Sequence, residues 1–306
     1  MRFLTDEEDI VATALRTWHL SKTYHGRAAL SAMNLTVPSD VVFGYLGPNG
    51  AGKTTTIRLL AGLLRPSSGR AEIGGYDVVR DRERAQRQIG YLPGDFAAYP
   101  RLTAAAYLDH LGYLRGGPDR ARIRSLADRL DLDLNVRIGA MSHGNRQKVG
   151  IVQAFMHAPA LLVLDEPTAG LDPLIQRQFL ELVREARERG QTVFLSSHNL
   201  YEVEAVADMV GILVRGRLAV VEEVDKLKAQ AVRRIDLTFA GVPPDAALRG
   251  VAAVQQLTVT GHTAHLVVEG HTAELLRIAA PYGVEQIVTH EPDLEEVFLS
   301  YYDAQE

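Results

Sequence analysis

Short apolar runs separated by longer amphipathic segments dominate the chain from about residue 14 to residue 221. Val41–Leu46, Leu161–Leu164 and Val193–Leu195 are runs of this kind. Such runs are typical of strands that are buried on both faces of a parallel sheet, and the segments between them have the length of helices. The pattern therefore predicts an α/β domain over residues 14–221.

The periodicity becomes helical between Leu102 and Arg137. A Gly-Gly-Pro run at residues 116–118 divides this segment in two, because these residues interrupt helices. We therefore expect a helical subdomain, at about residues 95–140, inserted into the α/β domain. The apolar positions that recur at helical spacing are Tyr107, Leu108, Leu111 and Leu114, then Ile123, Leu126 and Leu130.

The pattern changes again after residue 221. The order of the segments predicts strand, short helix, strand, strand, helix, strand, helix, which resembles a small ferredoxin-like α+β domain over residues 222–306. Residues 1–13 are polar and acidic without a regular apolar period, so we expect a frayed extension there. The predicted strands are Ile235–Phe239, Leu257–Val259, Leu266–Val268 and Val284–Val288, and the predicted helices near the end are Ala273–Ala280 and Leu294–Tyr301.

Composition limits the classes of protein to consider. No run of about 18 uncharged apolar residues occurs, so we expect no membrane-spanning helix. The first ten residues carry four carboxylates, where a secretory signal needs positive charge and an apolar core, and we expect a cytoplasmic location. The absence of cysteine excludes disulfides and thiolate metal sites. A net charge of −5 argues against nucleic acid as the main partner.

Residues 47–54 fit the pattern GxxxxGK followed by Ser or Thr, between an apolar strand and a helix-like segment. Glycines let backbone N–H groups curl around phosphate oxygens, and the helix N-terminus adds its positive dipole end. Lys53 is expected to bridge the β and γ phosphates of ATP, and Thr54 to bind Mg²⁺. The residues expected to surround the nucleotide phosphates are Gly47, Asn49, Gly50, Ala51, Gly52, Lys53, Thr54 and Thr55.

Asp165 and Glu166 directly follow the apolar run at 161–164. Open α/β sheets carry their chemistry at the carboxyl ends of strands, so these carboxylates suit two tasks. We expect Asp165 to hold the Mg²⁺ hydration shell, and Glu166 to polarise the water that attacks the γ phosphate. An Asp-Glu pair also occurs as a solvated strand end, and only its combination with the phosphate loop favours the catalytic interpretation.

With these two motifs in place, the region from Leu20 to Val214 resembles the ATP-binding subunits of ABC transporters. The resemblance implies a P-loop NTPase fold that binds ATP and Mg²⁺. It also implies a separately encoded integral-membrane permease, which holds the chain at the inner face of the membrane, and a second copy of the chain in a head-to-tail dimer closed by ATP. Tyr24 matches the aromatic residue that stacks on adenine in this family.

Three further segments carry the resemblance. Ser142 and Gly144 lie in a string similar to the family signature LSGGQ, which binds the γ phosphate held by the other subunit. Asp172 matches a residue that reaches across the dimer. His198, which follows the run at 193–195, matches the histidine that contacts the γ phosphate and orients Glu166 and water.

The sequence departs from the family pattern at Gly94, where the family places a Gln that senses Mg²⁺ and the attacking water. Asp95 is the nearest candidate to replace that side chain. A positive φ at Gly94 could swing the Asp95 carboxylate toward the metal. The alternative is that Asp95 is a solvated loop residue and that water fills the gap.

The resemblance is greater to ATPases of bacterial drug-type and polymer-type exporters than to importers, because of the altered signature and the tail at residues 291–299. An importer ATPase and a soluble ABC ATPase that acts on DNA or ribosomes remain alternatives, as does a regulatory protein that binds nucleotide without turnover. We expect Leu102–Arg137 and the Gly94 loop to form the groove for a permease helix, and the C-terminal domain to support or regulate the dimer.

Overall fold

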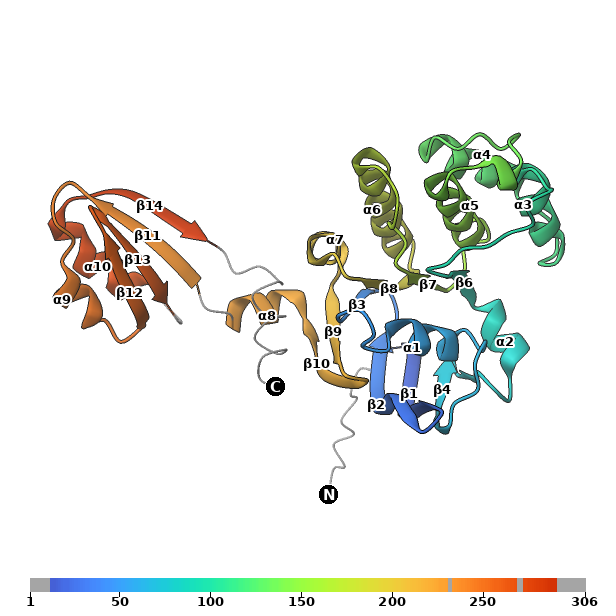
Figure 1. Ribbon diagram of the computed structural model, residues 1–306, viewed down its shortest axis with the longest axis horizontal. Coiled ribbons are helices and arrows are strands. Elements are labelled where there is room, and N and C mark those ends of the chain that lie inside the picture. Colours follow the sequence, from blue (N-terminus) through green and yellow to red (C-terminus); the bar gives the residue numbers. More distant parts are fainter. Residues whose placement is uncertain (1–11, 231–232, 269–271, 291–306) are drawn as a thin grey trace, which may run out of the picture. The chain divides into compact units, whose positions relative to one another are not determined.

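The computed structural model describes residues 12–230, 233–268 and 272–290 (Figure 1). The chain divides into two compact units, Met1–Val221 and Glu222–Glu306, at the position where the sequence pattern changes. Residues 1–11 of the expected extension, the predicted helix at 294–301 and the tail at 291–299 lie outside the described residues. Strand β1 begins at Thr13, which is inside the segment expected to be frayed.

The first unit contains a six-stranded sheet in the order β10-β9-β3-β8-β7-β6. Neighbouring strands from β9 to β6 are parallel, and every residue of β3, β7 and β8 is buried. The short apolar runs therefore form buried parallel strands, as the pattern predicts. The strands are β3 (Val42–Leu46), β6 (Ile89–Leu92), β7 (Leu161–Asp165), β8 (Thr192–Ser197), β9 (Met209–Val214) and β10 (Arg217–Glu223).

A second, four-stranded sheet in the order β2-β1-β4-β5 has antiparallel neighbours. At alternate positions of β2, Met33, Leu35 and Val37 are buried in a core that the sheet shares with β3 and with helix α1 (Lys53–Leu60). The alternation of buried and exposed positions is what a sheet with one solvated face requires. Its strands are β1 (Thr13–Tyr24), β2 (Arg27–Pro38), β4 (Ser68–Ile73) and β5 (Tyr76–Asp77).

Helices α3, α4 and α5 lie together at one end of the first unit (Figure 1). Thr103 caps α3 and Asp119 caps α4, each accepting a hydrogen bond from a backbone N–H in the first turn. Gly116 and Gly117 separate the two helices with φ values of +100° and +126°. The helices are α2 (Arg82–Arg87), α3 (Ala104–Tyr113), α4 (Arg120–Arg129), η1 (Ile138–Ala140), α5 (His143–Phe155), α6 (Pro173–Glu188) and α7 (Leu200–Val206).

The second unit contains an antiparallel sheet in the order β12-β13-β11-β14. Side chains from the sheet, α9 and α10 form one core, in which Leu237, Leu248 and Leu275 are fully buried. Helix α8 is an element that the sequence pattern did not indicate. The elements are α8 (Val224–Gln230), β11 (Arg233–Phe239), α9 (Asp245–Arg249), β12 (Val254–Thr260), β13 (Thr263–Val268), α10 (Ala273–Ala279), η2 (Ala280–Tyr282) and β14 (Val284–His290).

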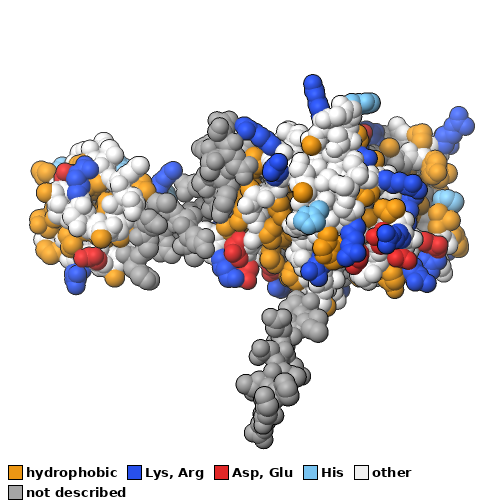
Figure 2. Space-filling model, turned by 90° about the horizontal axis from the view of Figure 1, so that it is seen from below, with side chains coloured by type: hydrophobic (Ala, Val, Ile, Leu, Met, Phe, Trp, Pro, Cys, Tyr) orange, Lys and Arg blue, Asp and Glu red, His pale blue; other side chains and the backbone are white. Residues whose placement is uncertain are grey.

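Two observations bear on the partners of the chain. None of the helices in the described part of the chain has the length and hydrophobicity that crossing a bilayer requires. On the face shown in Figure 2, Lys and Arg side chains are scattered among acidic and apolar ones rather than gathered in one stripe.

Candidate active site

The loop between β3 and α1 has a backbone that only glycine adopts easily. Gly50 and Gly52 have φ values of +81° and +111°. A Cβ atom at Gly52 would lie 2.5 Å from the carbonyl oxygen of Ala29, so no side chain fits there. No side chain caps the N-terminus of α1. The first amides of this helix, around Thr54, are therefore available to an anion, which the positive end of the helix dipole also favours.

Lys53 is buried, although its ammonium group carries a charge. Its Nζ donates a hydrogen bond of 2.6 Å to the Gly47 carbonyl oxygen and lies 3.5 Å from Oε1 of Glu166. A buried charge must be balanced by hydrogen bonds or an opposite charge, and these two groups supply both. The contact places Glu166 beside the loop at residues 47–52.

Asp165 has one carboxylate oxygen satisfied and one without a partner. Oδ1 accepts a hydrogen bond of 2.7 Å from Ser196 Oγ, whereas Oδ2 is buried and has no hydrogen-bond partner among the described residues. A buried carboxylate oxygen without a partner is costly, and Mg²⁺ prefers such oxygen ligands. Burial and, secondarily, the negative charge of Asp165 raise the pKa of Tyr91 on β6.

These observations fit a metal that takes few protein ligands. Within the described ranges there is no group of three or more His, Cys, Asp or Glu side chains that could hold a metal ion. Mg²⁺ in phosphoryl-transfer sites is bound by one or two protein ligands and completes its shell with water and phosphate oxygens. Asp165, together with the exposed hydroxyl-bearing residue Thr54, matches that pattern.

Glu166 lies between Lys53 and His198. Its Oε2 is 2.6 Å from His198 Nδ1 and 3.3 Å from the His198 backbone nitrogen, which donates to it. The backbone of Glu166 has a φ of +48°, a left-handed conformation that costs a residue with a Cβ about 1 kcal/mol. The surrounding contacts hold the carboxylate in this conformation, at the end of β7 and beside the end of β8.

Helix α5 brings the signature-like segment, which contains Ser142 and Gly144, close to the loop that follows β7. Ser142 caps α5 by accepting a 3.2 Å hydrogen bond from the Asn145 N–H. A Cβ atom at Gly144 would lie 2.6 Å from the Gly170 carbonyl oxygen, so the helix and the loop after β7 are in close contact. Gln147 Nε2 donates hydrogen bonds to the carbonyl oxygens of Glu166 and Pro167, at 3.3 and 3.1 Å.

Asp172 lies at the start of α6, and Tyr24 lies at the end of β1. Asp172 caps α6, because its Oδ1 accepts hydrogen bonds from the N–H groups of Leu174 and Ile175. Its expected reach across a dimer stays a prediction. Tyr24, at the end of β1, is 41% exposed, and Lys22 Nζ lies 5.2 Å from the centre of its ring. A partly exposed ring is what stacking on a base requires.

The explanation for Gly94 by a positive φ is wrong, because Gly94 is not among the glycines with positive φ. Glycine at this position is explained instead by the lack of space for a side chain. A Cβ atom at Gly94 would lie 3.3 Å from both Cγ and Oδ2 of Asp165, so a side chain here would crowd the carboxylate. Asp95 is exposed, and it forms no hydrogen bond or ion pair with the other described residues. Its role at the metal stays a prediction, which Mg²⁺ titrations of Asp95→Ala and Asp95→Asn would test.

Several buried polar residues at the site were missed by sequence reasoning. Ser196, Gln147 and Glu202 each lie within a few residues of a motif, and each is buried. Polar residues of this kind are rarely buried without hydrogen-bond partners. Each has a hydrogen-bond partner that lies 19 to 34 residues away in the chain, so no local pattern in the sequence marked them.

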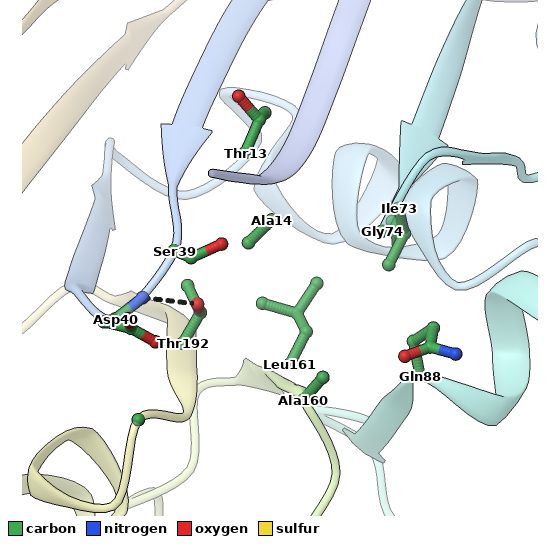
Figure 3. Close-up of a pocket in the computed structure, with 11 residues that line it drawn as sticks. Thr13, Ala14, Ser39, Asp40, Ile73, Gly74, Gln88, Ala160, Leu161 and Thr192 are labelled. Carbon is green, nitrogen blue, oxygen red and sulfur yellow. Dashed lines mark hydrogen bonds between the residues drawn. The ribbon is translucent and has the colours of Figure 1, made fainter. Parts of the chain in front are cut away.

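A hollow of about 120 Å³ lies at the amino ends of the parallel strands, opposite the edge that carries Asp165 and Glu166 (Figure 3). Leu161 and Thr192, which begin β7 and β8, contribute to its wall, and the Asp40 N–H donates a 3.0 Å hydrogen bond to Thr192 Oγ1. None of the predicted site residues lines this hollow. Asp165 and Ser197, which end β7 and β8, lie at the other, carboxyl edge of the sheet, where an open α/β fold is expected to carry its site.

The chain is similar to known proteins over most of its length. The family model described as ABC transporter matches residues 30–169. The linearmycin resistance ATP-binding protein LnrL of Bacillus subtilis is 31% identical over 306 residues, which cover 94% of this chain and 97% of that protein. The bacitracin transport ATP-binding protein BcrA of Bacillus licheniformis is 37% identical over 221 residues, 71% of this chain and 72% of that protein.

A solved structure extends the comparison to the fold. The ATP-binding subunit of an ABC transporter superposes with a TM-score of 0.66 at 32% identity, covering 71% of this chain and 93% of that one. Because full-length relatives and a solved structure agree with the family model, the resemblance inferred from the motifs is confirmed. The chain belongs to the family of ABC transporter ATP-binding proteins.

Proposed function

We propose that this chain is the ATP-hydrolysing subunit of an ABC exporter. The observation that carries the proposal is the contact of Glu166 with both Lys53 and His198, beside the glycine loop at residues 47–52. A carboxylate, a buried ammonium group and an imidazole at the carboxyl edge of a parallel sheet suit phosphoryl transfer to water. The chain would lie at the inner face of a membrane, held there by a separate permease.

The site residues divide the chemistry among them. The glycine-loop amides and Lys53 hold the nucleotide phosphates and balance their charge. Mg²⁺, held by Thr54 and Asp165, would add charge neutralisation at the phosphates when bound. Glu166 orients the attacking water and accepts its proton. His198, which is hydrogen-bonded to Glu166 through both its ring and its backbone, keeps that carboxylate in place.

We propose that the first unit, residues 14–221, is the nucleotide-binding domain and that it works as a head-to-tail dimer. Ser142, Gly144 and Asp172 would then face the nucleotide of the second copy. Ser142 supports this, because it is the N-cap residue of α5. Its hydroxyl and the first backbone amides of the helix lie close together, and this combination suits a phosphate.

The unit after residue 221 is proposed to be a ferredoxin-like domain that supports or regulates the dimer. After α8, its described strands and α-helices run β, α, β, β, α, β, and the central strands of its sheet are β11 and β13. This order and the fully antiparallel pairing support the ferredoxin-like assignment. The sequence of this unit carries no phosphate-binding or catalytic motif, which favours a supporting role. The described part of its sheet does hold one cluster of titratable side chains, in which Asp236 lies 2.8 Å from His265 Nδ1 and 3.2 Å from His290 Nε2.

Export is favoured over import by the comparisons. The names of LnrL and BcrA describe linearmycin resistance and bacitracin transport. An importer ATPase remains the second candidate, because its chemistry at ATP would be the same. Reconstituting the chain with the membrane protein encoded beside it, in inside-out vesicles, distinguishes the two. An exporter would load the vesicles with substrate when ATP is added outside, and an importer would not.

The groove for the permease is proposed to lie on the helical subdomain, and cysteine crosslinking tests this. Tyr99 and Tyr113 are 61% and 63% exposed there, whereas Tyr107 is buried and donates a hydrogen bond to Gln153. The chain has no native cysteine. We expect Tyr99→Cys or Tyr113→Cys to crosslink to the permease in membranes. Val242→Cys, at an 85% exposed position of the second unit, is the control. Crosslinking through Val242→Cys alone would contradict the assignment.

A further inference from the structure

Glu202, in the first turn of α7, has a carboxylate that is buried and fully hydrogen-bonded. It is 8% exposed. Its Oε2 accepts a hydrogen bond of 2.6 Å from Thr168 Oγ1 and a longer one of 3.4 Å from Ser197 Oγ. Its Oε1 accepts one of 3.1 Å from Asn199 Nδ2. No basic side chain of the described residues forms an ion pair with it, so these hydrogen bonds compensate its burial.

The hydrogen-bond partners of Glu202 belong to the two loops that carry the candidate base and its histidine. Thr168 follows Glu166 by two residues, in the loop between β7 and α6. Ser197, the last residue of β8, and Asn199, the N-cap residue of α7, flank His198, and the Asn199 N–H also donates a 2.9 Å hydrogen bond to Ser197 Oγ. One buried carboxylate thus ties together the loops whose ends meet in the contact between Glu166 and His198.

A simpler interpretation is that Glu202 only stabilises the start of α7. An acidic residue in the first turn of a helix is favoured by the helix dipole. That effect needs no contact with Thr168, which is 34 residues away in the chain. It also does not require burial of the carboxylate, because an exposed acid interacts with the helix dipole as well. The short hydrogen bond across the two loops therefore indicates a second role.

We propose that Glu202 is a positioning residue for ATP hydrolysis, which acts by holding the Glu166 loop against the His198 loop. This proposal rests on the proposed ATPase function of the same site. Glu166 Oε2 and His198 Nδ1 are 2.6 Å apart, and a contact this short depends on the relative placement of the two loops. A displacement of about 1 Å in a catalytic group can lower a rate by about a hundredfold.

Two substitutions remove the link from opposite sides. Glu202→Gln keeps the shape of the side chain but removes its charge and one acceptor oxygen, and Thr168→Val removes the hydroxyl at nearly constant volume. We expect each to lower kcat for ATP roughly tenfold while KM changes by less than about twofold, because the phosphate loop is untouched. Thr168→Ser, which keeps the hydroxyl, should retain the wild-type kcat.

The double variant distinguishes a shared link from two separate effects. If Thr168 and Glu202 act through one hydrogen bond, kcat of Thr168→Val with Glu202→Gln should be close to that of either single variant. Glu188→Gln, an exposed position near the end of α6 with the same change of charge, serves as the control and should keep the wild-type rate. Thermal denaturation midpoints identify any variant that has lost its fold. If Glu202→Gln is such a variant, the comparison of Thr168→Val with Thr168→Ser still tests the proposal.

The proposal would be overturned if the wild-type chain is active and if Glu202→Gln and Thr168→Val, both folded, have the wild-type kcat. Rate losses that multiply in the double variant would overturn it as well, since they exclude a shared link. A wild-type chain without ATPase activity would instead contradict the proposed function. The two failures are therefore distinguishable in the same experiment.

Discussion

Glu166→Gln is expected to bind ATP about as tightly as the wild-type chain and to hydrolyse it roughly a thousandfold more slowly. The amide keeps the size of the carboxylate and can still accept a hydrogen bond from His198. It cannot accept a proton from water at neutral pH, so the attacking water loses its base. Nucleotide binding is retained because the glycine loop at residues 47–52 and Lys53 are unchanged.

The same variant should accumulate as an ATP-bound dimer, since closure by ATP is no longer followed by hydrolysis. Phosphate release measures turnover, and size-exclusion chromatography with and without ATP measures the dimer. Glu188→Gln provides a matched control, because it removes one exposed carboxylate from α6 and should behave as wild type. Wild-type turnover in Glu166→Gln would show that another group activates the water.

Lys53→Ala is expected to weaken ATP binding by roughly a hundredfold, the factor that loss of hydrogen bonds to a charged group typically produces. Lys53 Nζ is buried against the Gly47 carbonyl oxygen and Glu166, which places it at the loop that would hold the phosphates. Its removal leaves the triphosphate charge without its main protein counter-charge. Turnover should fall with affinity, in contrast to Glu166→Gln.

Titration calorimetry with ATP and Mg²⁺ measures the loss directly. Lys226→Ala is the control, because Lys226 is an exposed lysine of the second unit that pairs with Glu222 and Glu223. Its ATP affinity should equal that of the wild type. An unchanged affinity in folded Lys53→Ala would place the phosphates elsewhere in the molecule.

The parts of the site that are local in sequence were predictable. The loop at residues 47–52 lies between a strand and a helix that follow one another directly, so its role could be inferred from spacing and residue type. Asp165 ends a buried strand and Glu166 follows it directly, which fixes their place at the sheet edge. His198 required the family resemblance, because a single histidine after a strand has no specific pattern of its own.

The parts that depend on contacts between distant segments were not predictable. Glu202 meets Thr168 across 34 residues, and Gln147 meets the Glu166 carbonyl across 19, without any periodic signal. The space restriction at Gly94 comes from Asp165 on the neighbouring strand, and the sequence suggested a conformational reason instead. Likewise, the strands after residue 221 were recognisable, but their order in the sheet depends on pairings that sequence patterns do not specify.

We propose above all that the groups around Glu166 hydrolyse ATP. Phosphate release from ATP by the purified wild-type chain, measured with Mg²⁺ and again with a chelator, tests it most directly. We expect Mg²⁺-dependent release of one phosphate for each ADP formed, at a rate well above that of Lys53→Ala and Glu166→Gln prepared in parallel. A wild-type rate no higher than the rates of these two variants would contradict it.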